Sequence, residues 1–126
     1  CRILGQAMEL RDHESKRHQY NLLAKAIKFI DEHYSEESMS LERVARTVSV
    51  SPNYFSAVFS QEIGQTFIEY LTNKRIEEAK RMLKHTEMRS SEIATAVGYK
   101  DPHYFSFVFK KVSGLTPNEF RRGCRK

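Results

Sequence analysis

Tryptophan is absent from this 126-residue chain, and cysteine is scarce, with only Cys1 and Cys124 near opposite ends. Two cysteines so placed form neither a disulfide framework nor a metal-ligand cluster, so we expect no metal and no cofactor. The chain also lacks a glycine-rich phosphate loop and a catalytic His/Asp/Glu constellation, which argues against an enzyme. No ligand spacing relates the five histidines, His13, His18, His33, His85 and His103.

Long apolar runs are also missing. No stretch approaches the roughly 18 residues that a membrane-spanning helix requires, and polar side chains dominate residues 1–20, unlike a signal peptide. Hydrophobic residues make up 40% and charged residues 29% of the chain, as in a folded domain with a core. We therefore expect a cytoplasmic protein without membrane contact. Because the chain begins at Cys1 and not at methionine, we interpret it as a piece whose upstream part is missing.

Proline is rare, and strand-like alternation of useful length does not occur. Each of the three prolines stands at the beginning of a predicted helix, where its missing N–H is not needed: Pro52, Pro102 and Pro117. Apolar residues recur instead at spacings of three and four, and the connecting stretch places Ile68, Leu71, Ile76, Ala79, Met82 and Leu83 on one face. The predicted fold is all-α, with about seven helices. Residues 1–19 are interpreted as a linker or the end of an upstream helix.

The chain contains an internal repeat with an offset of about fifty residues. Residues 54–59 read Tyr-Phe-Ser-Ala-Val-Phe and residues 104–109 read Tyr-Phe-Ser-Phe-Val-Phe. Each copy continues with a glycine that can end the helix and a Thr-x-x-Glu capping box. A short helix and a tight turn precede each copy, as in a helix-turn-helix unit. We predict one such subdomain over residues 20–64 and another over 86–126, joined by a long helix within 65–85.

The second helix of each unit has an apolar and a polar side. In the helix predicted over about 52–63, the apolar side is Tyr54, Phe55, Val58, Phe59 and Ile63; over about 102–113 it is Tyr104, Phe105, Val108 and Phe109. Gly98 is expected to adopt a positive φ in the second turn, before Asp101 caps the helix. The remaining outward residues are the candidates for contact with a ligand.

Those outward residues suit the bases of duplex DNA, because the N-terminal half of a recognition helix meets base edges in the major groove. Asparagine can pair with adenine, serine can donate or accept, and an apolar side chain can contact a thymine methyl. For Phe107, packing against a neighbouring helix is the alternative. The predicted base contacts are Asn53, Ser56, Ala57, His103, Ser106 and Phe107.

The charge distribution also favours a polyanion as ligand. Residues 1–37 hold six Lys/Arg and seven Asp/Glu, whereas residues 38–126 hold fifteen and nine. A basic excess attracts DNA, although each cation taken singly can also be a solvated surface charge. The predicted phosphate contacts are Ser51, Ser60, Lys100, Lys110, Lys111, Arg121 and Arg122. The long helix, roughly 28 Å from end to end, could hold two recognition helices about one DNA turn apart.

Residues 38–122 resemble the DNA-binding domain of the AraC/XylS family of bacterial transcription regulators. Residues 92–121 are similar to that family's C-terminal signature, and Val-Gly-Tyr-Lys-Asp-Pro-His-Tyr-Phe-Ser within them resembles the YesN-type response regulators, as does the lead-in over 25–34. The resemblance implies binding of double-stranded promoter DNA in successive major grooves, RNA polymerase as a further partner, and an upstream receiver or sensor domain. Family members often carry arginine or another long polar residue where this chain has Ala57 and Phe107, which disfavours guanine recognition there. A helical protein–protein interaction module without direct DNA binding is the alternative.

Overall fold

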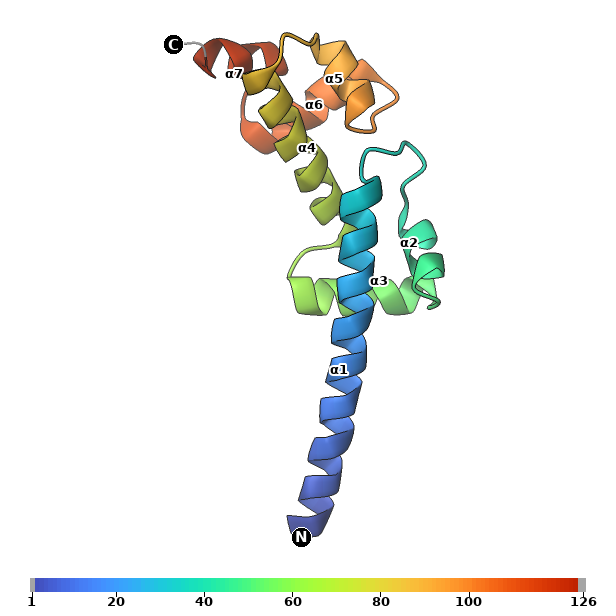
Figure 1. The fold of residues 1–126 in the computed structure, drawn as a ribbon. Helices are drawn as coiled ribbons and strands as arrows, with labels where there is room; N and C mark the ends of the chain where they lie inside the picture. Colours follow the sequence, from blue (N-terminus) through green and yellow to red (C-terminus); the bar gives the residue numbers. More distant parts are fainter. Residues whose placement is uncertain (1, 125–126) are drawn as a thin grey trace.

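The computed structural model describes residues 2–124 and shows seven α-helices among them, without a strand in that range (Figure 1). This confirms the predicted all-α fold. No helix in this range is long and apolar enough to cross a lipid bilayer. The helices are α1 (Arg2–His33), α2 (Leu41–Thr47), α3 (Pro52–Ile63), α4 (Phe67–His85), α5 (Ser90–Ala96), α6 (Pro102–Ser113) and α7 (Pro117–Cys124).

Helix α1 is a single uninterrupted helix of 32 residues. Its N-terminal half extends away from the other helices, and only its C-terminal half lies beside them (Figure 1). Leu23, Ala26 and Ile30 of that second half are buried at spacings of three and four. The segment interpreted as a linker or the end of an upstream helix therefore continues without a break into the first helical unit.

Two separate hydrophobic cores flank the middle of α4. The first core runs from Leu22 of α1 to Leu71 of α4 and includes the aromatic rings of α3. The second begins at Ile76 of the same helix and extends through α5 and α6. The N-terminal part of α4 thus packs in the first core and its C-terminal part in the second. Helix α4 is the long central helix that the repeat predicted.

The two longer helices of the repeat have the same kinds of ends. Ser51 and Asp101 are the N-caps of α3 and α6, and each side chain accepts a backbone N–H of the first turn. Gly64 and Gly114 end these helices in the left-handed region, with φ of 81° and 85°. Matching ends give α3 and α6 the same 12-residue length, so the sequence repeat is also a structural repeat.

The turn of each unit also uses one left-handed residue. Gly98 has φ of 106°, as the sequence predicted, and Ser49 occupies the matching position of the first unit with φ of 63°. Glycine adopts this region without steric cost, whereas serine does so less readily. The common backbone conformation shows that both turns reverse the chain in the same way.

Candidate nucleic-acid interface

Helices α3 and α6 bury equivalent side chains. Phe55, Val58 and Phe59 are buried in α3, and Phe105, Val108 and Phe109 are buried in α6. The rings pack at centroid distances of 5.6 Å for the α3 pair and 5.8 Å for the α6 pair. Because these apolar residues anchor each helix to its own core, the opposite face of each helix is left for a ligand.

Two tyrosines that the sequence placed in the cores lie outside them. Tyr54 is 41% exposed and Tyr104 is 57% exposed. Each tyrosine precedes the first buried phenylalanine of its helix by one residue, which turns its side chain away from the core by about 100°. The Tyr104 ring lies 6.0 Å from that of Tyr99, centroid to centroid. Both tyrosines therefore enlarge the outward surface of α3 and α6.

The prediction that Ile68 belongs to the buried face of α4 was also wrong. Ile68 is 63% exposed, whereas Phe67 is buried among the rings of α3. The helix begins at Phe67, and the buried ridge proceeds from that residue at intervals of four. Ile68 instead borders a hollow of about 400 Å³ between α4 and α6, together with Tyr104 and Phe107.

The predicted base-contacting residues lie on the outward faces of α3 and α6. Asn53, Ala57, His103 and Phe107 are exposed, and the two serines, Ser56 and Ser106, are half-buried. Phe107 is 63% exposed, so it is not buried against a neighbouring helix, and its contact with a base stays a prediction. Because an exposed phenylalanine gains nothing in water, Phe107 remains available for an apolar contact with a ligand.

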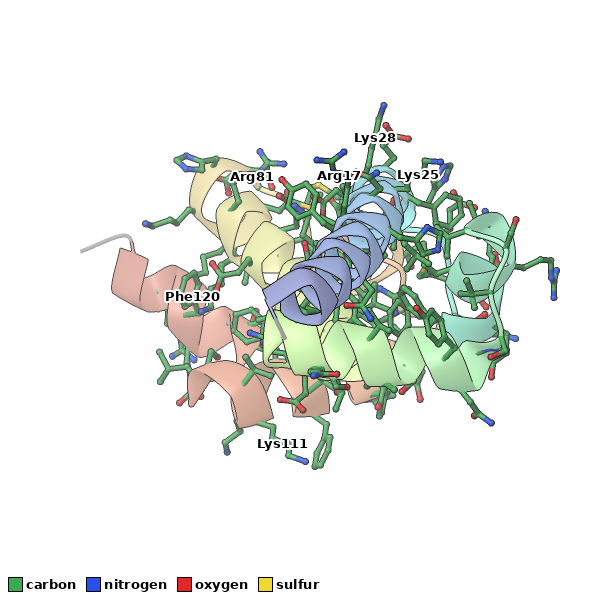
Figure 2. The ribbon with its side chains drawn as sticks, turned by 90° about the horizontal axis from the view of Figure 1, so that it is seen from below. Arg17, Lys25, Lys28, Arg81, Lys111 and Phe120 are labelled. Atoms are coloured by element: carbon green, nitrogen blue, oxygen red, sulfur yellow. The ribbon has the colours of Figure 1, made fainter. Side chains whose placement is uncertain are left out.

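Most predicted phosphate-contacting residues are accessible. Lys100, Lys110, Lys111 and Arg122 are exposed, and none forms an ion pair within the part of the chain that is described. Lys111 points away from the helices (Figure 2). Two hydroxyls complete the set: Ser60 is half-buried, while exposed Ser51 accepts the Tyr54 N–H and keeps its own hydroxyl proton for donation.

Arg121 is a correction to that set. Its Nε donates to the carbonyl of Leu83 at 3.2 Å, and its Nη2 donates to the carbonyl of Thr86 at 3.1 Å. These carbonyls are at the C-terminal end of α4, where they lack partners within the helix. Arg121 thus fastens α7 to the end of α4, whereas its neighbour Arg122 is exposed.

Arg75 was not predicted from the sequence as a functional residue, yet among the described side chains it is the buried charged one, with 8% of its surface exposed. Desolvation lowers the pKa of its guanidinium, which nevertheless has hydrogen-bond partners. A signal was present in the sequence, because Arg75 interrupts a ridge of otherwise apolar residues spaced by four. The ridge consists of Phe67, Leu71, Arg75, Ala79 and Leu83, and all five are buried.

Comparison with known proteins agrees with this architecture. Residues 44–123 match a family model described as a helix-turn-helix domain. The C-terminal domain of AraT, a response regulator from Geobacillus stearothermophilus, is similar with a TM-score of 0.80 and 43% identity, over 81% of this chain and 84% of that one. The chain belongs to the AraC/XylS family.

Further AraC/XylS relatives match a similar share of this chain. The C-terminal domain of the response regulator yesN from Fusobacterium nucleatum has a TM-score of 0.78 and 35% identity, over 80% of this chain and 98% of that one. The arabinose operon regulatory protein of Escherichia coli is 35% identical over 84% of this chain, which is 36% of that protein. This AraC/XylS chain therefore spans well under half of the length of the curated relatives it matches. It is a DNA-binding domain of a transcription regulator.

Proposed function

We propose that this chain is the DNA-binding output domain of a two-component response regulator, with α3 and α6 entering successive major grooves of promoter DNA. The response regulators AraT and yesN, whose C-terminal domains it resembles, support this placement. An upstream receiver or sensor domain, a cytoplasmic location and contact with RNA polymerase belong to the same proposal.

The observation that carries the proposal is the pairing of two equivalent exposed helix faces on one central helix. Helix α4 has 19 residues, which makes it roughly 28 Å long, close to one turn of DNA. Each end of α4 holds one core, and each core holds one recognition helix. The spacing suits two consecutive grooves on one side of the duplex.

Each proposed base contact has a distinct chemistry. The amide of Asn53 matches the N6 and N7 edge of adenine, while Ser56 and Ser106 can donate or accept. Ala57 and Phe107 are apolar and suit thymine methyl groups. His103 stands at the second position of α6 and can donate or accept through its ring. The proposed phosphate contacts are Ser51, Ser60, Lys100, Lys110, Lys111 and Arg122.

The two-groove geometry predicts that Asn53→Ala and His103→Ala act on different half-sites. Each change removes one base contact, so preference at one position should fall by about 1–3 kcal/mol. The two affected positions should lie about ten base pairs apart. Selection of bound sites from a random duplex pool measures both effects. Gln61→Ala, at an exposed position in the last turn of α3, is the control that should keep the wild-type preference. Loss of preference at the same base pair in both variants would contradict the proposal.

Lys111→Ala and Arg122→Ala are expected to weaken binding to all duplex sequences equally. The slope of log K against log salt should fall by about one unit for each lost phosphate contact. Titrations of a selected and an unrelated duplex at several salt concentrations measure this slope. Arg81→Ala is the matched control, because Arg81 lies on the opposite side of the molecule from Lys111 (Figure 2). A change in base preference without a change in slope would assign these residues to bases and not to phosphates.

A further inference from the structure

The boundary between the two hydrophobic cores is occupied by a charged side chain. Leu71 belongs to the first core and Ile76 to the second, and Arg75 lies between them on the buried side of α4. Burying a charge is costly unless its hydrogen bonds are satisfied. An apolar residue would continue the ridge of α4 at lower cost, so the contacts of Arg75 indicate what the charge does here.

One side of the guanidinium holds the first helix-turn-helix unit. Nε of Arg75 donates to the carbonyl of Tyr34 at 2.8 Å, and Nη2 donates to the carbonyl of Glu36 at 3.0 Å. Both carbonyls lie in the loop between α1 and α2, about forty residues earlier in the chain. A planar fork of donors suits two backbone carbonyls held in one orientation.

The other side of the same guanidinium contacts the second unit. Its central carbon lies 5.2 Å from the centroid of the Tyr99 ring, a cation–π distance. A Cβ placed on Gly98 would come within 3.0 Å of three guanidinium atoms, so the turn between α5 and α6 approaches Arg75 as closely as its backbone permits. Gly98 therefore serves two purposes, the left-handed turn and the room for this contact.

Other polar contacts of α4 do not join the two units. Tyr70 and Lys74 of α4 reach Asp31 of α1 at 3.2 and 3.8 Å, but these exposed pairs connect α4 to the first unit alone. Extensive packing between helices α1–α3 and helices α5–α7 is absent from the described residues, and α4 packs on both groups. Because each core packs on α4 separately, a side chain that contacts both units can fix their orientation relative to one another.

We propose that Arg75 is the positioning residue that fixes the relative orientation of the two helix-turn-helix units, and thereby the half-site spacing that the domain accepts. The inference rests on the proposed binding of two successive grooves. Because both units belong to one chain, the second groove contact is intramolecular and can raise affinity by about 10²–10⁴-fold. A fixed orientation of the units limits that gain to DNA whose half-site spacing fits. Arg75 touches no DNA in this scheme, because it is buried between the cores.

Two variants distinguish the contacts of Arg75 with both units from the mere burial of a side chain at this position. Arg75→Lys keeps the charge, but one ammonium group lacks the planar fork that engages two carbonyls and stacks on a ring. Arg75→Leu keeps the apolar ridge and removes every polar contact. Arg81→Leu is the control, since Arg81 is an arginine of the same helix whose exposed side chain pairs with Glu78 of α4 and donates to none of the carbonyls that Arg75 binds.

The first test measures binding to a selected site and to versions with two base pairs inserted between the half-sites, which rotates one half-site by about 70°. Wild type and Arg81→Leu should lose about 10²-fold on insertion. Both Arg75 variants should bind the original spacing about tenfold more weakly and lose less than tenfold on insertion. Arg75 variants that discriminate between the spacings as well as wild type does would overturn the inference. A wild type without spacing dependence would instead overturn two-groove binding.

A second test needs no DNA. Spin labels at Glu42 of α2 and Ser91 of α5, in a chain with Cys1→Ser and Cys124→Ser, report the distance between the units by pulsed electron resonance. A narrow distribution is expected for wild type and a broad one for Arg75→Lys, with helix content unchanged by circular dichroism. If Arg75→Leu unfolds, Arg75→Lys decides, and an equally narrow distribution in that variant would refute the assignment.

Discussion

The affinity of this domain for duplex DNA is expected to fall by about 10³–10⁵-fold between about 50 and 200 mM salt. Binding releases the counterions that DNA phosphates had condensed, and each released ion makes binding more sensitive to added salt. Lys100, Lys110, Lys111 and Arg122 are exposed and without ion-pair partners in the described structure, so they can neutralise phosphates. Backbone N–H groups at the starts of α3 and α6 are expected to add further phosphate contacts.

Fluorescence anisotropy with a labelled duplex at several salt concentrations measures this dependence. Six to ten phosphate contacts correspond to a slope of about −5 to −9 in log K against log salt. Unrelated duplex DNA should show a comparable slope at lower affinity, because phosphate contacts carry little sequence information. A flat response for both duplexes would favour a helical module that binds protein and not DNA.

The second large effect is a contrast between two phenylalanines of the same helix. Phe109→Ala should destabilise the fold by about 3–5 kcal/mol and lower Tm by roughly 10–20 °C, whereas Phe107→Ala should leave Tm nearly unchanged. Phe109 is fully buried and packs edge-on against Phe120 at 5.6 Å, while Phe107 is 63% exposed. The substitution and the helix are identical, so burial alone separates the two outcomes.

DNA binding should follow a different pattern. Phe107→Ala is expected to weaken specific binding, because its ring would bury apolar surface against a thymine methyl at about 25 cal/mol per Å². Replacing that thymine with uracil removes the methyl and should reduce the difference between wild type and variant. Thermal melts without DNA check the stability result. A large drop in Tm for Phe107→Ala, or equal losses on thymine and uracil, would contradict the proposed contact.

The three errors of register on the helix faces share one cause. Tyr54, Tyr104 and Ile68 are apolar or amphipathic residues next to true core positions, and periodicity alone placed them one residue from the correct register. Only one stripe of an amphipathic helix faces the core, and adjacent apolar residues compete for positions on that stripe. The rings of Phe55, Phe105 and Phe67 occupy that room, so their neighbours remain in water.

Arg121 and Arg75 show what local patterns cannot supply. Both donate to backbone carbonyls of segments more than thirty residues away, and no spacing in the sequence marks those acceptors. Arg121 therefore read as a phosphate contact beside Arg122. The sequence marks Arg75 as an arginine within an apolar ridge of α4. Only the tertiary structure shows that both units contact its side chain.

The sequence by itself determined the helices, their caps and the two-fold repeat, because these depend on residues within three or four positions of one another. Ser51, Asp101, Gly64 and Gly114 act at helix ends as their local chemistry requires. Tertiary structure decided which aromatic rings enter the cores, which arginines serve the fold, and how the two units are joined. Those outcomes depend on competition for buried space and on hydrogen bonds between distant segments, and neither is encoded in the local periodicity of the chain.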